Sequence, residues 1–297
     1  MSKASPKNPR LPAEFEPQEA IWLSWPSNRE SCPKTYDRLQ DKFGELASTI
    51  SRYERVRINA PMLSHMGIRL AVADNEGDLS QVDIYEHATN DVWCRDHGPI
   101  FIKDKTNGAL SITDWKFNGW GEQFPPYDLD NQIPERAAEV LKMDRFTSDM
   151  VLEGGAIETN GAGVLITTEA VILDKKRNPK MTKAAAEKEF KRMFGIESVF
   201  WLDKGISGDD TGGHIDDMVR FIREDAVICM VEPKDSDPNH KVLKKVREQL
   251  DDLRTADGSK VEIIEVEMPN AVEAKNWRLL MEGGAIHCVA MHEPKAG

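Results

Sequence analysis

The sequence predicts a mixed α/β fold in which a unit of strand, strand, helix and strand recurs along a chain of 297 residues. Short apolar or alternating runs indicate strands, and apolar residues at helical spacing indicate helices between them. The order of these segments differs from the regular strand–helix alternation of a doubly wound parallel sheet. A repeated glycine motif is the third observation, and it indicates that the units are pseudo-symmetric.

The glycine motif occurs twice in the chain. Residues 152–157 read Leu-Glu-Gly-Gly-Ala-Ile, and residues 281–286 read Met-Glu-Gly-Gly-Ala-Ile. A glycine pair permits a positive φ or a close backbone approach. We therefore expect each copy to form a short bend beside a strand. The second copy continues into His287 and Cys288, which indicates that one unit has been specialised.

The strands and helices follow from local patterns. Strands are expected over residues 20–26, 55–60, 81–86, 100–102, 109–117, 164–173, 198–202, 218–221, 226–231 and 261–266. Pro26 ends the first of these strands, and Asn107-Gly108 is a turn signal before the fifth. Helices are expected over residues 35–55, 66–75, 133–141, 182–194 and 242–253. Residues 118–130, rich in glycine, proline and aromatics, are expected to form a long surface loop.

Composition limits the possible classes of protein. We expect a flexible tail over residues 1–10 and a single domain over residues 11–297. A net charge of −12 argues against nucleic-acid binding and favours a cationic partner, although acidity can also serve solubility alone. The sequence shows no CxxC pair, no signal peptide and no long apolar run. A cytoplasmic protein that binds no membrane is expected.

Four polar clusters are candidates for chemistry: residues 93–99, 153–155, 208–216 and the stretch around Cys288. In an extended chain His214 and Asp216 would share one face, which suits general acid/base work. The glycine-rich run before them could equally be an ordinary turn, and a lone cysteine is often a buried apolar residue. A metal site would need further ligands, so none is expected. The chain also lacks the glycine-rich motifs of nucleotide cofactor sites.

Taken together, the clusters resemble one family. Trp-Cys-Arg-Asp-His-Gly-Pro, Glu-Gly-Gly, Gly-Gly-His-Ile-Asp and Gly-Gly-Ala-Ile-His-Cys occur in this order, after an opening Leu-Pro-Ala-Glu-Phe-Glu-Pro. They are similar to the motifs of the agmatine deiminase and bacterial-type peptidylarginine deiminase family, within the guanidine-modifying superfamily. The resemblance covers roughly residues 11–291 and implies a five-module α/β propeller (a pentein-like fold).

The resemblance also implies a set of roles for individual residues. It gives Cys288 as nucleophile, His214 as general acid/base, Glu153 as the acidic partner of that histidine, Asp96 and Asp216 as guanidinium ligands, Trp93 as a pocket wall, and Asp210 as a support of the histidine turn and a substrate contact. The implied reaction converts agmatine to N-carbamoylputrescine and ammonia through a covalent amidino-cysteine, without a metal or organic cofactor. Cys94 is a rival nucleophile. His287 and Arg95 are expected to be structural.

One region departs from the family pattern. Only residues 270–281 lie between Pro269 and the second glycine motif, where the family has about one module more, so we expect an incomplete C-terminal module. Such a gap predicts an open seam or an exposed sheet edge. The alternatives to agmatine deimination are deimination of peptidyl or free arginine and a catalytically impaired, cation-binding homologue. The expected partner is a small guanidinium cation, with a homodimer possible.

Overall fold

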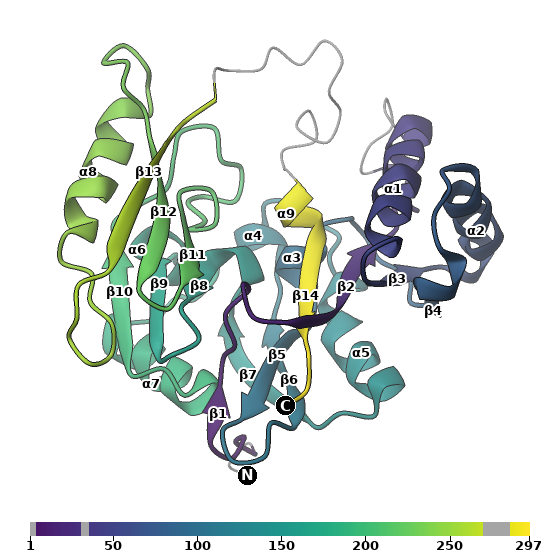
Figure 1. Ribbon diagram of the computed structural model, residues 1–297, viewed down its shortest axis with the longest axis horizontal. Helices are drawn as coiled ribbons and strands as arrows, with labels where there is room; N and C mark the ends of the chain where they lie inside the picture. The colour runs from purple at the N-terminus through teal and green to yellow at the C-terminus, as the bar shows by residue number, and fades with distance from the viewer. Residues whose placement is uncertain (1–3, 31–35, 270–285) are drawn as a thin grey trace.

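The computed structural model describes residues 4–30, 36–269 and 286–297, and the strands within them form four sheets (Figure 1). The first sheet has the order β14 (Ala290–Pro294), β2 (Gln18–Ser24), β3 (Arg55–Ala60) and β4 (Val82–Glu86), and the second has the order β1 (Pro9–Arg10), β5 (Ile100–Asp104), β6 (Leu110–Lys116) and β7 (Arg145–Val151). The third sheet has the order β10 (Ser198–Leu202), β9 (Val164–Thr168) and β8 (Ile157–Thr159). The fourth has the order β11 (Val219–Arg223), β12 (Ala226–Val231) and β13 (Glu262–Glu267). A mixed α/β fold is therefore confirmed.

The four sheets share one plan. An inner strand pairs antiparallel with a middle strand, and the middle strand pairs parallel with the strand beyond it. A parallel pair needs a crossover, and a helix supplies it in each case. These helices are α1 (Tyr36–Ser51), α5 (Ile133–Leu141), α7 (Lys183–Phe194) and α8 (His240–Leu250), which lie around the outside of the molecule in Figure 1. The predicted order of strand, strand, helix and strand is thus confirmed.

The first sheet is assembled from distant parts of the chain. β14 pairs antiparallel with β2, with Ala290 opposite Leu23. The strand after Cys288 therefore completes the module of β2 to β4, instead of belonging to an incomplete one. Five modules were expected, and the described residues hold four. The short interval 270–281 lies outside the described residues.

A tight turn precedes each inner strand. These turns are α3 (Cys94–His97) before β5, η4 (Gly154–Ala156) before β8, residues 214–218 before β11, and α9 (Ile286–Val289) before β14. The bend expected at the first glycine motif is confirmed by η4 and β8, whereas residues 281–285 of the second lie outside the described residues. The assumption of an extended chain at Trp93 to Asp96 is wrong, because α3 is helical and places these side chains differently.

The remaining differences have local causes. Strand β7 was missed because its sequence does not alternate, and residues 169–172 form the short helix α6 instead of continuing a strand. The chain enters the second sheet at Pro9–Arg10, which pair with β5, so the expected tail ends before residue 9. The other helical segments are α2 (His65–Asp74), α4 (Gly119–Glu122), η1 (Met62–Ser64), η2 (Leu79–Gln81) and η3 (Asp130–Gln132). None of the described helices is long and apolar enough to cross a membrane.

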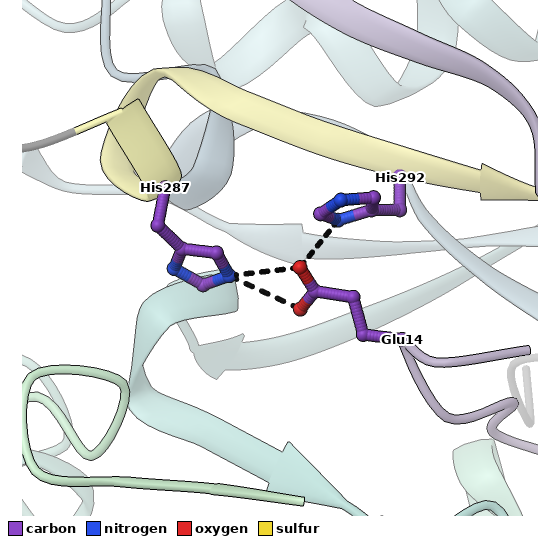
Figure 2. A group of neighbouring side chains, drawn as sticks. All are labelled: Glu14, His287 and His292. Atoms are coloured by element: carbon purple, nitrogen blue, oxygen red, sulfur yellow. Dashed lines mark hydrogen bonds and ion pairs between the residues drawn. The ribbon is translucent and has the colours of Figure 1, made fainter. Parts of the chain in front are cut away.

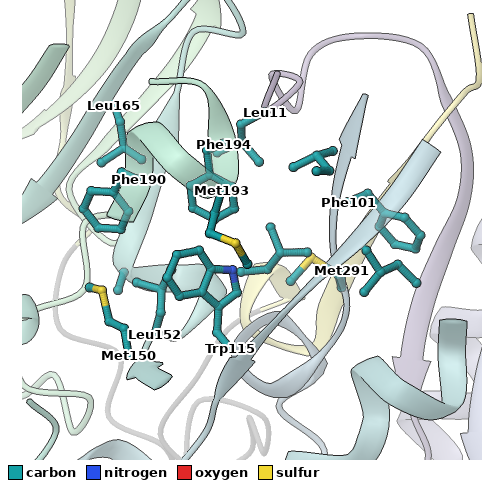
Figure 3. Packing of buried hydrophobic residues seen from close by; sticks show 14 of the residues in the cluster. Leu11, Phe101, Trp115, Met150, Leu152, Leu165, Phe190, Met193, Phe194 and Met291 are labelled. Carbon is teal, nitrogen blue, oxygen red and sulfur yellow. The ribbon is translucent and has the colours of Figure 1, made fainter. Parts of the chain in front are cut away.

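The largest apolar core joins three of the modules (Figure 3). Trp115 of β6 packs on Phe194 of α7 with ring centroids 4.9 Å apart, and Met291 of β14 belongs to the same cluster. Burial of such large side chains stabilises the fold by about 1.5–3 kcal/mol each. Packing between modules therefore fixes the relative positions of the turns that carry the polar motifs.

Candidate active site

His214 lies buried among three carboxylates that come from three different turns. Its Nδ1 is 3.6 Å from Oδ1 of Asp96 and 3.9 Å from Oδ1 of Asp216. Its Nε2 is 3.7 Å from Oε2 of Glu153. The structure thus brings together four of the residues that the sequence singled out. An acidic cage of this kind stabilises a positive charge at its centre.

Gly155 makes this close approach possible. A Cβ atom at this position would lie 2.5 Å from Nδ1 of His214 and 2.8 Å from Oδ1 of Asp96, so a larger residue would displace one of them. The N–H of Gly155 donates to Oδ1 of Asp96 at 3.0 Å, and its carbonyl accepts the N–H of Asp216 at 3.3 Å. The glycine is needed for space rather than for a positive φ.

The cage shifts the pKa values of its members. Burial lowers the pKa of His214, but the charge of Asp96, the contact with Glu153 and the charge of Asp216 outweigh it and raise the value to about 10. Burial raises the pKa of Asp96 to about 6, aided by Asp216 and Glu153 and opposed by His214. The imidazole of the substrate-free protein therefore carries a proton at neutral pH.

Arg177, which the sequence analysis missed, neutralises Glu153. Its Nε donates to Oε1 of Glu153 at 2.8 Å, and its Nη2 donates to the carbonyl of Thr211 at 2.5 Å. Burial raises the pKa of Glu153, but His214 and Arg177 outweigh it, and the net shift is downward. Arg177 follows the exposed residues Lys175 and Lys176, so in the sequence it looks like part of a basic, solvent-exposed segment. The one available signal was that a buried carboxylate needs a cation.

Asp209, and not Asp210, holds the histidine turn. Oδ2 of Asp209 accepts the N–H groups of Gly213 at 2.7 Å and His214 at 3.0 Å, and Oδ1 accepts the N–H of Thr211 at 2.7 Å. Asp210 is exposed, and its carbonyl accepts Nε2 of Gln123 at 3.0 Å. The support role that was expected of Asp210 therefore belongs to its neighbour, Asp209. Its expected contact with substrate stays a prediction.

Two tryptophans lie beside the cage. Nε1 of Trp120 donates to Oδ2 of Asp96 at 2.9 Å, from a segment that was expected to be an exposed loop. Trp120 adopts a positive φ of 55°, a conformation that local propensity does not favour, so sequence gave little signal for its position. Trp93 is buried in the same apolar cluster as Trp120 and Phe117. Cys288 packs against this cluster.

The two candidate nucleophiles differ in environment. Cys288 is partly exposed and lies in the turn α9. Cys94 is completely buried, and burial raises the pKa of its thiol to about 12. Because the thiolate is the nucleophilic form, this environment disfavours Cys94. Cys288, which is partly exposed, is thus the better candidate of the two.

His287 links the cage to a second polar cluster. Its Nδ1 is 2.7 Å from Oδ2 of Asp216, and its Nε2 is 3.0 and 3.1 Å from the two oxygens of Glu14. Burial raises the pKa of Asp216, but the hydrogen bond and charge of His287 outweigh it and lower the value. Nη2 of Arg95 lies on the same side, 3.3 Å from Glu14 and 2.5 Å from Nδ1 of His292. Glu14 was part of the opening motif, but no role was assigned to it.

Comparison with known proteins places this arrangement in a family. The family described as Porphyromonas-type peptidyl-arginine deiminase matches residues 10–281. The chain belongs to this family. The matched region of the deiminase family contains Asp96, Glu153, His214 and Asp216, and it ends before Cys288.

Individual members of the deiminase family give the same picture. The agmatine deiminase of Medicago truncatula is 32% identical over 271 residues, covering 87% of this chain and 71% of the relative. The agmatine deiminase of Pseudomonas aeruginosa (strain LESB58) is 32% identical over 270 residues, covering 89% and 72%. The solved agmatine deiminase of Enterococcus faecalis matches with a TM-score of 0.84 and 28% identity, covering 91% of this chain and 74% of that one.

Proposed function

We propose that this protein is an agmatine deiminase, a hydrolase that converts the guanidinium group of agmatine to a ureido group and releases ammonia. The observation that carries the proposal is the buried cage of Asp96, Glu153 and Asp216 around His214. A guanidinium is a planar cation with several N–H donors, and carboxylates bind it well. The agmatine deiminases among the relatives support this choice of substrate.

One oxygen of the cage is ready to accept a donor. Oδ1 of Asp216 is buried and accepts no hydrogen bond from the described part of the chain. Such an orphaned acceptor is costly in a protein interior. In the proposed complex the substrate guanidinium donates to it, while Asp96 binds a second nitrogen and holds the central carbon in place.

The proposed reaction has two halves. The thiolate of Cys288 attacks the guanidinium carbon, and the proton on His214 moves to the departing nitrogen, which leaves as ammonia. His214 then takes a proton from a water molecule, which attacks the amidino-cysteine. The bond from carbon to sulfur then breaks, the remaining hydroxyl proton passes to solvent, the ureido product is released, and the thiolate of Cys288 is regenerated. This chemistry needs no metal or organic cofactor.

The described arginines near the cage are already paired with carboxylates, which favours agmatine over arginine as the substrate. Arginine carries an α-carboxylate that would need a cationic partner. Arg177 is already bound to Glu153, and Arg95 is bound to Glu14. Among the described residues of the cage, the carboxylates of Asp96, Glu153 and Asp216 outnumber the protonated imidazole of His214. Agmatine has an ammonium at its far end, which suits such surroundings.

The test is turnover by the purified protein. We expect ammonia and N-carbamoylputrescine in equal amounts from agmatine, measured by coupled ammonia assay and mass spectrometry. Bound agmatine without product would instead favour the impaired, cation-binding homologue. Product from arginine or arginyl peptides alone would favour the second candidate, deimination of arginine.

The broader expectations from the sequence stay predictions. The shared plan of the four described modules supports a propeller, and we retain its five-module form with an incomplete C-terminal module as a proposal. A homodimer and a cytoplasmic location are likewise retained, and size-exclusion chromatography with light scattering tests the first of them. Nucleic acid is not an expected partner, given the net charge of −12, and a membrane is not expected as a partner either.

A further inference from the structure

We infer that Glu14, His287 and His292 form a binding site for one divalent transition-metal ion, with Zn²⁺ as the preferred ion. The three side chains converge from the N-terminal segment, α9 and β14 (Figure 2). One ligand atom from each lies within 4.8 Å of the other two. None of the three ligands belongs to the catalytic cage, although His287 is hydrogen-bonded to Asp216, and the inference does not depend on the proposed reaction.

The distances between the donor atoms match the size of such an ion. Oε1 of Glu14 is 3.1 Å from Nε2 of His287 and 2.9 Å from Nδ1 of His292. Zinc binds nitrogen and oxygen at about 2.0–2.2 Å, so neighbouring ligand atoms of a tetrahedral site lie roughly 3.3 Å apart. Two imidazoles and one carboxylate are a ligand set that suits Zn²⁺ better than Mg²⁺ or Ca²⁺.

The surroundings orient both imidazoles as ligands. Nδ1 of His287 is hydrogen-bonded to Asp216 at 2.7 Å, which directs Nε2 towards Glu14. A carboxylate on the far nitrogen of a metal-binding histidine is a common supporting contact. Nη2 of Arg95 donates to Nδ1 of His292 at 2.5 Å, so this nitrogen presents a lone pair. Nδ1 of His292 therefore lies as an acceptor only 2.9 Å from the acceptor Oε1 of Glu14, an arrangement that a cation bound to both in place of Arg95 would relieve.

Two guanidinium groups are also close to Glu14. Nη2 of Arg95 is 3.3 Å from Oε1, and Arg220 binds Oε2. Arg220 is also held by Glu158 at 2.7 Å, so it can keep Oε2 in place while Oε1 faces the histidines. The incoming ion would take the place of Arg95 at Oε1 and at Nδ1 of His292.

An ion can reach the site from solvent. The side chains of Glu14, His287 and His292 are 22%, 23% and 20% exposed. Glu14, Arg95 and His292 also line a cavity of about 80 Å³ that opens to the surface. This is room for more than one water molecule, and zinc sites with three protein ligands complete their coordination with water.

The test is calorimetric titration of the full chain with Zn²⁺ in a Cys288→Ser background, which removes the neighbouring thiol as a ligand. We expect one ion per chain, and at least about tenfold weaker binding after either Glu14→Gln or His292→Asn. His240→Asn, which changes a partly exposed histidine paired with Asp235 on another module, should bind as the parent does. Zn²⁺ should also raise the unfolding temperature of the parent more than that of the two ligand variants.

Two results would overturn the inference. One is the absence of Zn²⁺ binding by the Cys288→Ser parent. The other is equal affinity in the parent and both ligand variants, with each variant showing the circular dichroism of the parent. Because Glu14 lies in a loop and His292 in a strand, the two substitutions test the site through independent parts of the fold.

Discussion

Nε of Arg177 donates to Oε1 of Glu153 at 2.8 Å, and both side chains are almost completely buried. A buried carboxylate that loses its hydrogen-bonded guanidinium is poorly compensated by His214, whose Nε2 lies 3.7 Å from Oε2 of Glu153. We therefore expect Arg177→Met to lower the free energy of unfolding by about 3–5 kcal/mol. Urea denaturation followed by circular dichroism measures the change.

Two further variants show whether burial of the charge is the cause. Arg177→Met combined with Glu153→Gln should recover part of the lost stability, because the uncompensated charge is gone. Lys183→Met breaks a pair with Glu169 in which both side chains are more than a third exposed, and should cost about 1 kcal/mol or less. Equal losses from Arg177→Met and Lys183→Met would contradict the argument.

Removal of the proposed nucleophile, Cys288, should abolish turnover. We expect Cys288→Ala to lower kcat by at least about a thousandfold while the unfolding midpoint stays close to that of the parent. Cys94→Ala should keep turnover within about tenfold, because the thiol of Cys94 is buried and its pKa is raised to about 12. Steady-state ammonia release measures both. The reverse ranking of the two variants would assign the nucleophile to Cys94.

The neighbouring residues Asp209 and Asp210 should have separable effects. Asp209→Ala removes an acceptor of the N–H groups of Gly213 and His214, so we expect a loss of about 1–3 kcal/mol in stability and a lower kcat. Asp210→Ala changes an exposed side chain, so stability should be unchanged, while KM for agmatine rises if it contacts substrate. Thermal unfolding and steady-state kinetics separate the two. Similar losses of stability in both variants would contradict the assigned support role.

The protonated state of His214 should make stability depend on pH. Its pKa is about 10 in the folded protein and about 6.5 when unfolded, so the folded state binds the proton more tightly. This contribution is fully present below pH 6.5 and is lost as the pH rises towards 10. We expect the parent to lose up to about 1.4 kcal/mol per pH unit more than His214→Asn between pH 7 and 10. Urea denaturation of the substrate-free proteins measures this, and parallel curves would refute it.

Substrate choice should follow the charge of the cage. We expect kcat/KM for agmatine to exceed that for free arginine by at least about a hundredfold, which is on the order of 2.7 kcal/mol of transition-state discrimination. With its guanidinium bound by Asp96 and Asp216, arginine would have its α-carboxylate desolvated at the far end of the substrate without a cationic partner. Competition between the two substrates in one assay measures the ratio. Equal turnover of arginine, or of an arginyl peptide, would reject agmatine but not the guanidine chemistry.

Local patterns in the sequence were sufficient for much of the fold. The helix expected over residues 133–141 is α5, and strands such as β12 were placed at their observed bounds. Apolar periodicity is a property of neighbouring residues, so it can be read without knowing the tertiary structure. Residues 164–173 were misassigned in part because an apolar run does not distinguish a strand from a short buried helix.

The site could be predicted only where a motif carried it. Asp96, Glu153, His214 and Asp216 lie in motifs that precede inner strands, and the fold brings these strands together. Trp120, Arg177 and Glu14 come from other segments, whose positions depend on contacts between distant parts of the chain. The exchange of Asp210 for Asp209 shows that a turn decides which neighbouring carboxylate faces inward. The order of residues in the sequence does not show which of the two carboxylates faces inward.

The pairing of β14 with β2 has a consequence during protein synthesis. Trp22 and Glu293, which are 271 positions apart, meet across this sheet. The ribosome completes β2 long before β14, so the backbone N–H and C=O groups on this edge of β2 stay unpaired until β14 has been made. Unpaired strand edges of nascent chains attract other strands and chaperones. The turn that carries Cys288 reaches its position only with this late pairing, so the protein would be inactive until β14 has been synthesised.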